Sequence, residues 1–373
     1  MRRQRQQRGF TLMELMVGSL VTFVTVLAVS AAFLGYTQSF YTQAGIRGGQ
    51  ASLRQTHQML VRNLRMAGYG IDPPNAFGFP AGWSDDATRN RSDRLVFRMR
   101  NPAFNAYAAS VSATSITLPS TKPLSESLRK GQVLQVMCPG GIAWTYVQLN
   151  ADAAAGDLAL TLVPATGQFP TVNDFSAGCF GTAAGGDSVL IFKVDIYDYS
   201  IHLIDDDGNP LTVGRPYLFR RHGLDERDAA ALGEPVAEDI EALRVTFLRG
   251  DGTEFIPDPS ATPPGYRTPL DDPTRKNNNP ANIRAVRIGL VARSSTRDVG
   301  SPTDKMNQIP AFGSRPVLTG PYGFRRTLSE MSVQIRNMRS SQMPVPVYSI
   351  QKAPAGGGCS GSVPGDDLIC GGG

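Results

Sequence analysis

The residues from Leu15 to Leu34 form a run of twenty without a charged side chain, and no charge follows until Arg47. An α-helix rises about 1.5 Å per residue, so this run would extend about 30 Å, the thickness of a bilayer's hydrocarbon core. Because a backbone in lipid must satisfy its own hydrogen bonds, the run is predicted to be one membrane-spanning helix. The arginines among the first eight residues should keep the N-terminus cytoplasmic, which leaves about 340 residues on the other side.

One acid lies at the start of this run. Thr11-x-x-Glu14 matches a capping box, in which the two side chains satisfy N–H groups of the first helical turn. A carboxylate inside the membrane is costly, however, and is by default a candidate functional group with a cationic partner. If the chain were cut after Gly9, the new α-amino group of Phe10 would be such a cation. Its own Glu14 lies too close along the helix to pair well, whereas a neighbouring subunit's amine could reach it.

The stretch Arg8-Gly-Phe-Thr-Leu-Met-Glu-Leu15, followed by the apolar run, resembles the type III signal of type IV prepilins and type II secretion pseudopilins. The resemblance implies cleavage between Gly9 and Phe10 by a prepilin peptidase and N-methylation of Phe10. It also implies that Glu14, with Thr11 beside it, acts in subunit assembly by neutralising an N-terminus. The alternative is an ordinary secretory signal peptide cut after Ala28-Val29-Ser30. Glu14 and the length of the apolar run disfavour it.

Charge argues against a nucleic-acid partner. The chain has 37 basic and 32 acidic residues and a pI of about 9.1, but four of the arginines lie within residues 1–9. Removing those four from 37 leaves 33 basic residues against 32 acids, so the mature chain is nearly neutral and lacks a footprint for polyanions. Three scattered histidines and the absence of nucleophile-elbow, P-loop and H-E-x-x-H motifs indicate a protein that is not an enzyme and has no cofactor.

Four cysteines, Cys138, Cys179, Cys359 and Cys370, are candidates for disulfide bonds. They form no C-x-x-C pair and no histidine lies at metal-ligand spacing, so no metal site is predicted. An exported head lies in an oxidising compartment, where disulfides persist. Three pairings are open, and buried free thiols are the alternative. The pairing of Cys138 with Cys179 and of Cys359 with Cys370 is favoured because each closes a compact loop.

The helix is predicted to continue beyond the membrane. Apolar positions from Leu53 to Ala67 recur at steps of three and four, which places them on one helical face. His57 lies on that face and is interpreted as a packed core residue. Gly68, Gly70 and Pro73-Pro74 then signal the end, so the helix is expected from about Thr11 to Ala67.

From residue 71 onward, alternating apolar residues and turn signals predict a β-rich head. The expected strands are Arg94–Met99, Ser115–Leu118, Gln132–Met137, Ala143–Leu149, Asp157–Val163, Ser188–Ile204, Leu211–Arg220, Ala242–Leu248, Ile283–Ala292 and Arg326–Ile335. Residues 101–185 are interpreted as an inserted or enlarged β module. The predicted organisation is leader 1–9, assembly half of the helix 10–35, amphipathic half 36–70, head 71–343 and Pro/Gly-rich tail 344–373.

A second resemblance lies in the C-terminal half. Three phrases, Val236-Ala-Glu-Asp-Ile-Glu-Ala-Leu-Arg-Val-Thr-Phe247, Asn282-Ile-Arg-Ala-Val-Arg-Ile-Gly-Leu-Val-Ala-Arg293 and Arg325 to Asn337, are similar to the closing strands of PilW-type minor pilins. Leu64-Arg-Met-Ala-Gly-Tyr69 is similar to that family too. The resemblance implies an α+β, type IV pilin-like fold: one long N-terminal helix, membrane-spanning and then amphipathic, packed on a large antiparallel β-rich head.

That resemblance implies a non-catalytic minor pilin, which primes assembly of a type IV pilus and sits at its tip in adhesion and twitching motility. Its implied partners are other minor pilins, the major pilin, the prepilin peptidase and a large tip adhesin. It would lie in the inner membrane, head in the periplasm, before reaching the pilus tip. The absence of proline between Phe10 and Ile71 favours a tip subunit over a shaft subunit. The alternatives are a J-type minor pseudopilin of a type II secretion system and an anchored binding module unrelated to filaments.

Overall fold

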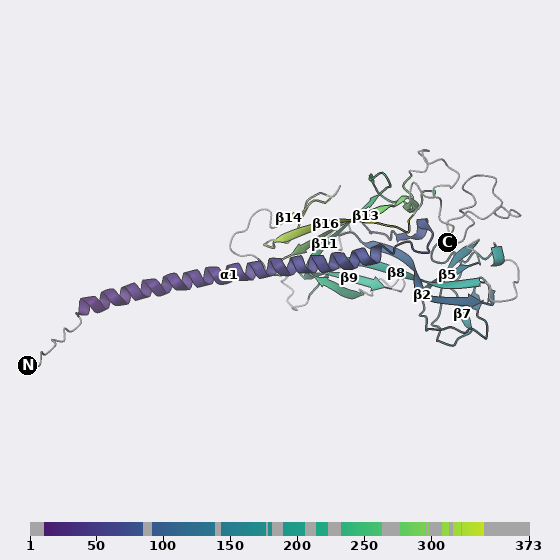
Figure 1. The fold of residues 1–373 in the computed structure, drawn as a ribbon, viewed down its shortest axis with the longest axis horizontal. Coiled ribbons are helices and arrows are strands. Elements are labelled where there is room, and N and C mark those ends of the chain that lie inside the picture. Colours follow the sequence, from purple (N-terminus) through teal and green to yellow (C-terminus); the bar gives the residue numbers. More distant parts are fainter. Residues whose placement is uncertain are drawn as a thin grey trace, which may run out of the picture.

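The computed structural model confirms the predicted fold class, with one long N-terminal helix packed on an antiparallel β-rich head (Figure 1). It describes residues 11–84, 92–138, 143–176, 178–180, 189–205, 214–222, 233–262, 277–295, 297, 308–312, 316–321 and 323–338. The predicted leader 1–9 and tail 344–373 lie outside these residues, as do Phe10, Cys359 and Cys370.

Helix α1 runs unbroken over Leu12–Leu64, three residues shorter at its end than the periodicity predicted. Its N-terminal half projects away from the head, and its C-terminal half lies along the head (Figure 1). The residues that pack inward, among them Leu53, Leu60 and Leu64, are buried. The chain leaves the helix through Gly68, whose φ is +75°, and Gly70, whose φ is +67°. Glycine adopts this left-handed conformation without a steric penalty, which accounts for the stop signal.

The ten predicted strands are present, some with shifted ends. They are β2 (Leu95–Ala108), β4 (Ser115–Thr117), β5 (Val133–Met137), β6 (Trp144–Gln148), β7 (Ala159–Thr161), β8 (Val189–Ile204), β9 (Arg215–His222), β11 (Ile240–Leu248), β13 (Ala285–Arg293) and β16 (Arg326–Gln334). Six strands were not predicted: β1 (Phe77–Gly78), β3 (Ser110–Val111), β10 (Glu234–Glu238), β12 (Glu254–Phe255), β14 (Gln308–Ile309) and β15 (Leu318–Thr319). Five of them have only two residues, too few to show a period, and β10 contains Pro235, which is a signal against a strand. Three 3-10 turns, Pro73–Asn75, Gly178–Phe180 and Pro280–Asn282, complete the described elements.

Two sheets build the head. The larger has the path β1-β2-β8-β5-β6, with β9 also paired to β8 and β10 paired to β9; the smaller has the order β12-β11-β13-β16. Strand β8 joins the two ends of the larger sheet, because its first residues pair with β5 and its last with β9, while β2 pairs along its other side. Two small sheets, β3-β4-β7 and β14-β15, lie outside these.

The main core lies between α1 and both large sheets. It joins helix residues such as Leu60 to Tyr199 and Ile201 of β8, and to Val286 and Ile288 of β13. A second core, which includes Ile116, Val147 and Leu160 and is formed largely by strands of residues 104–162, lies away from the helix. The helix is therefore anchored on the part of the head that contains the C-terminal sheet, and the module of residues 101–185 carries a core of its own.

Candidate assembly site

The first turn of α1 has the capping geometry that the sequence predicted. The backbone N–H and the hydroxyl of Thr11 both donate to Glu14 Oε2 at 3.0 Å, and the N–H of Glu14 donates to Thr11 Oγ1 at 3.3 Å. Among the described residues, Glu14 Oε1 accepts no hydrogen bond, so it is available to a second chain. Gly9 and Phe10 lie outside the described residues, so their cleavage and methylation stay predictions.

The projecting half of α1 is apolar on every side. Between Leu12 and Leu34 the large apolar side chains are exposed, from 53% for Leu27 to 78% for Leu12. By length and composition this helix could cross a membrane. Surface of this kind is stable only in lipid or against other apolar helices. The start of α1 therefore needs a membrane or a partner's apolar helices to cover its side chains.

Small residues bring the next stretch of α1 close to the head. A Cβ at Gly45 would lie 3.8 Å from the Cβ of Ser294, and one at Gly49 would lie 3.7 Å from the Cβ of Ala292. A groove of about 1190 Å³ lies between α1 and strands β9 and β10, and its lining includes Gly45 and Gly49. Ser52 Oγ crosses between these elements and donates to the carbonyl of Glu238 at 3.2 Å. The helix thus contacts the C-terminal sheet near Gly45 and Gly49, and Ser52 connects it to β10 beside the groove.

His57 is the histidine that the sequence placed on the packed face, and the structure confirms that position. Its ring is buried and its Nδ1 lies 3.1 Å from Ser329 Oγ on β16. Burial lowers the pKa of His57, because the imidazolium loses its hydration. Among the described residues no group of three or more His, Cys, Asp or Glu is arranged to hold a metal ion. His57 therefore joins the helix to β16.

Buried ion pairs hold the head together, and sequence reasoning missed all of them. Asp198 on β8 accepts from Arg94 Nε at 2.8 Å and from Arg221 Nε at 2.9 Å. Glu241 accepts both arms of Arg326, at 2.5 and 2.9 Å. Arg94 immediately precedes β2 and the other arginines and acids lie on different strands, so their pairing depends on the order of strands in the sheets. The sequence did contain one signal for these pairs, because each places a charged residue at a strand position that faces the core. Charged side chains are rarely buried there unless they have a partner.

A buried hydrogen-bond network connects the end of the helix region to the β module. The Tyr146 hydroxyl donates to Asp72 in a short contact, and Gln135 Nε2 donates to Tyr146 at 3.2 Å. Burial raises the pKa of Asp72, although Tyr146 and Asn75 act to lower it by hydrogen bonding. The network fixes the segment after α1 against β5 and β6.

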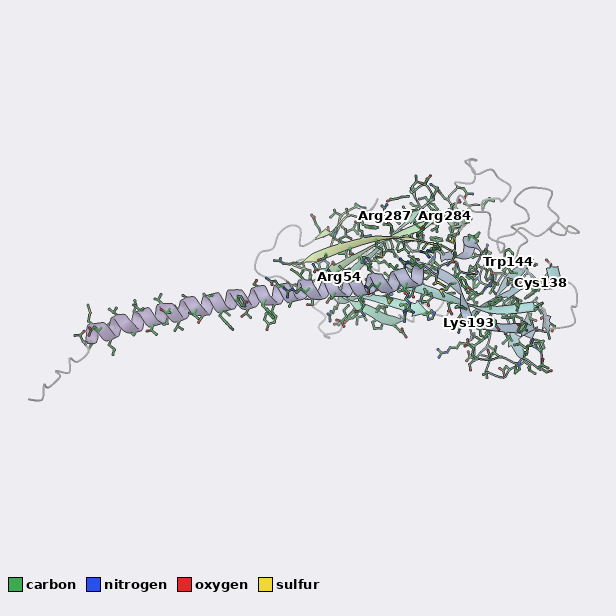
Figure 2. All side chains as sticks on the ribbon, viewed as in Figure 1. Arg54, Cys138, Trp144, Lys193, Arg284 and Arg287 are labelled. Atoms are coloured by element: carbon green, nitrogen blue, oxygen red, sulfur yellow. A yellow bond between two sulfur atoms is a disulfide. The ribbon has the colours of Figure 1, made fainter. Side chains whose placement is uncertain are left out.

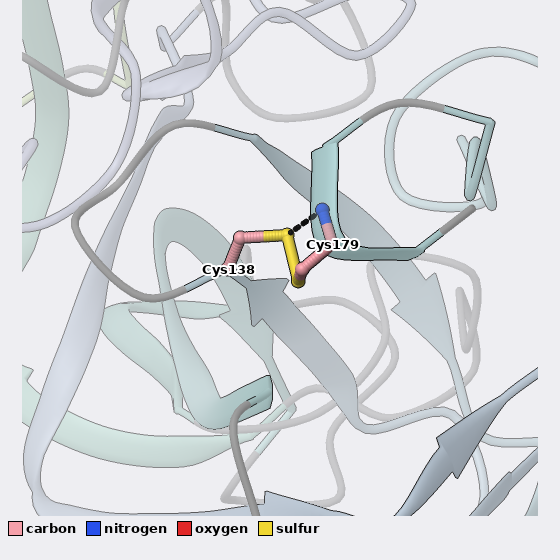
Figure 3. Close-up of a disulfide and its surroundings, with 2 residues drawn as sticks. All are labelled: Cys138 and Cys179. Carbon is pink, nitrogen blue, oxygen red and sulfur yellow. Dashed lines mark hydrogen bonds between the residues drawn. A yellow bond between two sulfur atoms is a disulfide. The ribbon is translucent and has the colours of Figure 1, made fainter. Parts of the chain in front are cut away.

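The disulfide between Cys138 and Cys179 is present, as predicted (Figure 3). It joins the end of β5 to the 3-10 turn Gly178–Phe180, and the backbone N–H of Cys179 donates to Cys138 Sγ at 3.0 Å. The other predicted pair, Cys359 with Cys370, lies outside the described residues and stays a prediction. Cys179 packs against the second core, so the disulfide stabilises the β module and lies far from the exposed half of α1.

Comparison with known proteins identifies the C-terminal half. The family model described as "Type IV Pilus-assembly protein W" matches residues 203–337, a little over a third of the chain. No curated protein matches. Among solved structures, a type IV-like pilin from Thermus thermophilus is 13% identical over 78% of this chain and 97% of that chain, with a TM-score of 0.27, too low to support any argument. Residues 203–337 are therefore similar to type IV pilus-assembly protein W, and in this chain they follow a long helix with an apolar first half that packs on an antiparallel head; the match supports a role related to type IV pili.

Proposed function

We propose that this protein is a minor pilin that primes assembly of a type IV pilus and sits at its tip, without catalytic activity. Its head would lie in the periplasm while α1 spans the inner membrane, after prepilin peptidase has cut between Gly9 and Phe10 and Phe10 has been N-methylated. The observation that carries the proposal is the position of Glu14. It is the acid of an exposed apolar helix start, and only one of its two oxygens is used by Thr11.

The chemistry of assembly follows from that position. A carboxylate at the edge of a hydrocarbon layer is costly when alone, and an opposite charge nearby offsets the cost. The methylated α-amine of a neighbouring chain's first residue is such a charge. Pairing of Glu14 with the amine of a neighbouring subunit would therefore align the new subunit's helix with its neighbours before the apolar helices pack. The partners would be other minor pilins and the major pilin, and a large tip adhesin would join them.

The unbroken helix supports a tip position. Helix α1 contains no proline and no break over Leu12–Leu64, whereas a proline in the middle of such a helix would kink it or unwind it locally. A stiff helix is less able to adapt to neighbours on all sides along a shaft. A head of this size, with a β module added to the C-terminal sheet, is also accommodated most easily at an end.

Two substitutions separate the assembly role of Glu14 from its capping role. Glutamine at the third helical position still completes a capping box, so Glu14→Gln keeps the cap and removes the charge. Thr11→Ala removes the cap and keeps the charge. We expect Glu14→Gln to insert into the membrane normally but to be absent from sheared pili, and Thr11→Ala to be incorporated. Equal incorporation of Glu14→Gln and wild type would reduce Glu14 to a cap.

Two further measurements test the rest of the proposal. Mass spectrometry of the mature chain should find N-methylated Phe10 as the first residue; a start after Ser30 would exclude a filament subunit. Deleting the gene should remove surface pili and twitching while leaving secreted enzymes unchanged. The reverse phenotype would select the J-type pseudopilin of a type II secretion system instead.

A further inference from the structure

Strand β16 is a long edge strand that no described strand covers. It pairs with β13 over its nine residues, Arg326–Gln334, in one continuous register without a bulge. Unpaired strand edges attract other strands, and proteins normally shorten, bend or cover them. An edge of this length and regularity is therefore a candidate interaction surface.

The other edges of the two large sheets are protected. Strand β10 contains Pro235 and has a bulge in its pairing with β9. Strands β1 and β12 have two residues each. Strand β6 is covered, because Val163 and Asn173 donate backbone N–H groups to the carbonyls of Gln148 and Tyr146. Among the described residues, β16 is thus a large-sheet edge that is long, straight and uncovered.

The hydrogen-bond pattern defines which groups point outward. The N–H of Ser294 donates to Arg325 O at 2.8 Å, and the N–H of Ile335 donates to Arg284 O at 3.0 Å. In an antiparallel pair these hydrogen-bonded positions alternate with positions whose N–H and C=O face away. Odd-numbered residues of β16 therefore bond to β13, and even-numbered residues present their backbone groups to the free edge. From Leu328 to Gln334 those even-numbered residues make no backbone hydrogen bond at this edge to any residue that the structure describes.

Helix α1 runs beside this edge and places arginines along it. His57 contacts Ser329, and the carbonyl of Arg65 accepts from Asn337 Nδ2 at 3.3 Å, so the helix and β16 run alongside each other over these residues. Arg54 and Arg65, three residues before and eight after His57, share the helical flank on this side; Figure 2 labels Arg54 on the part of α1 that lies against the head. Both are exposed, and neither makes an ion pair within the described part of the chain.

We propose that the free edge of β16 binds an extended acidic segment of another protein as an added antiparallel or parallel strand, with carboxylates on alternate residues pairing with Arg54 and Arg65. Backbone hydrogen bonds at the even positions supply affinity, and the flanking arginines select the partner's charge. The acidic residues belong on the helix side of the added strand. On the opposite side the exposed Glu330 favours uncharged or basic neighbours. This surface goes beyond the proposed filament role and does not depend on Glu14.

Hydrogen exchange of the full chain in detergent micelles tests the edge directly. The probe is a nine-residue synthetic peptide that alternates Thr and Glu. In the chain alone, the amides of Leu328, Glu330 and Ser332 should exchange fast and those of Ser329 and Met331 slowly. Peptide at about ten times its Kd should slow the even-numbered amides about tenfold. Even-numbered amides already protected in the chain alone, by its own C-terminal residues or a second copy, would overturn the proposal.

Charge variants on the helix test the partner's chemistry. Replacing both Arg54 and Arg65 with Glu should weaken the peptide's Kd about tenfold or more, equivalent to about 1.4 kcal/mol. Arg62→Glu is the control for a single charge reversal on the same helix, because Arg62 lies on the side of Tyr197. It should change the Kd less than about twofold, whereas Arg65→Glu alone should weaken it more than that. A similar loss in both cases, or equal binding of a peptide that alternates Thr and Lys, would refute specific acidic recognition.

Ser332→Pro tests the backbone contribution. Proline removes an N–H that faces the free edge and is tolerated in edge strands at such positions, so pairing with β13 should survive. We expect an unchanged melting temperature and at least a tenfold weaker Kd for the Thr-Glu peptide. Wild-type binding by this variant would show that the peptide does not pair with β16. If the variant does not fold, the exchange rates and the arginine variants decide the question.

Discussion

Asp198→Asn is expected to be among the most destabilising single changes in the head. The Asp198 carboxylate is 3% exposed and lies between two guanidinium groups, those of Arg94 and Arg221, which are 9% and 15% exposed. The amide keeps the shape of the side chain but removes its charge, so two buried arginines lose their counter-ion. Removing one partner of a buried ion pair typically costs about 3–5 kcal/mol. In a head of this size that corresponds to a fall of about 6–10 °C in melting temperature.

A second acid, paired with a lysine of the same sheet, provides the control. Glu126 pairs with Lys193 of β8, but its side chain is 48% exposed. Glu126→Gln makes the same chemical change in solvent, where an ion pair contributes at most about 1 kcal/mol. Thermal unfolding of the full chain in detergent, followed by near-ultraviolet circular dichroism, measures both variants. If Asp198→Asn costs no more than Glu126→Gln, the buried triad does not stabilise the head and the argument is wrong.

The pH dependence gives an independent check with a definite sign. Burial acts to raise the pKa of Asp198, but hydrogen bonding and charge from Arg94, together with Arg221, outweigh it, so the pKa is lowered. A lowered folded-state pKa stabilises the fold above the unfolded value of about 3.9, and this contribution is lost as the pH falls through the folded value. The difference between wild type and Asp198→Asn should therefore be constant from neutral pH to about pH 5 and shrink below about pH 4.

Three other variants test the packing of the head and of the helix. Replacing Cys138 and Cys179 with Ser should cost about 4 kcal/mol, since the disulfide closes a loop with a sequence separation of 41; reductant should reproduce the loss in wild type and leave the double variant unchanged. Gly289→Ala should cost about 1–3 kcal/mol, because the new Cβ would lie 2.7 Å from the Phe312 ring. In Gly48→Ala the new Cβ meets no atom within 4 Å, so this variant should instead stabilise the helix by up to about 1 kcal/mol. Urea unfolding measures the free energy of unfolding of both glycine variants, and equal changes in the two would contradict the expected difference.

Local sequence determined the elements of this protein. The apolar run and the inward face from Leu53 to Leu64 define α1, since a helical period over many turns is a strong signal. The Thr11–Glu14 cap and the left-handed glycines after the helix are equally local. Strands such as β11 and β13 alternate clearly enough to be predicted, whereas β14 has only two residues and β10 contains Pro235. The predicted Cys138–Cys179 bond depended only on loop length, which is also readable along the chain.

Only the tertiary structure decided which distant groups meet. The pairing of Asp198 with Arg94 and Arg221 follows from the order β2-β8-β9, which no local pattern specifies, and so does the burial of Arg326 against Glu241. The free edge of β16 is likewise a property of strand order, because any strand of that sequence would be ordinary in the middle of a sheet. The period of apolar residues along the chain indicates which face of a helix or strand is buried. Whether a charged side chain is buried, or a strand's backbone is exposed, depends instead on neighbours that are far away in sequence.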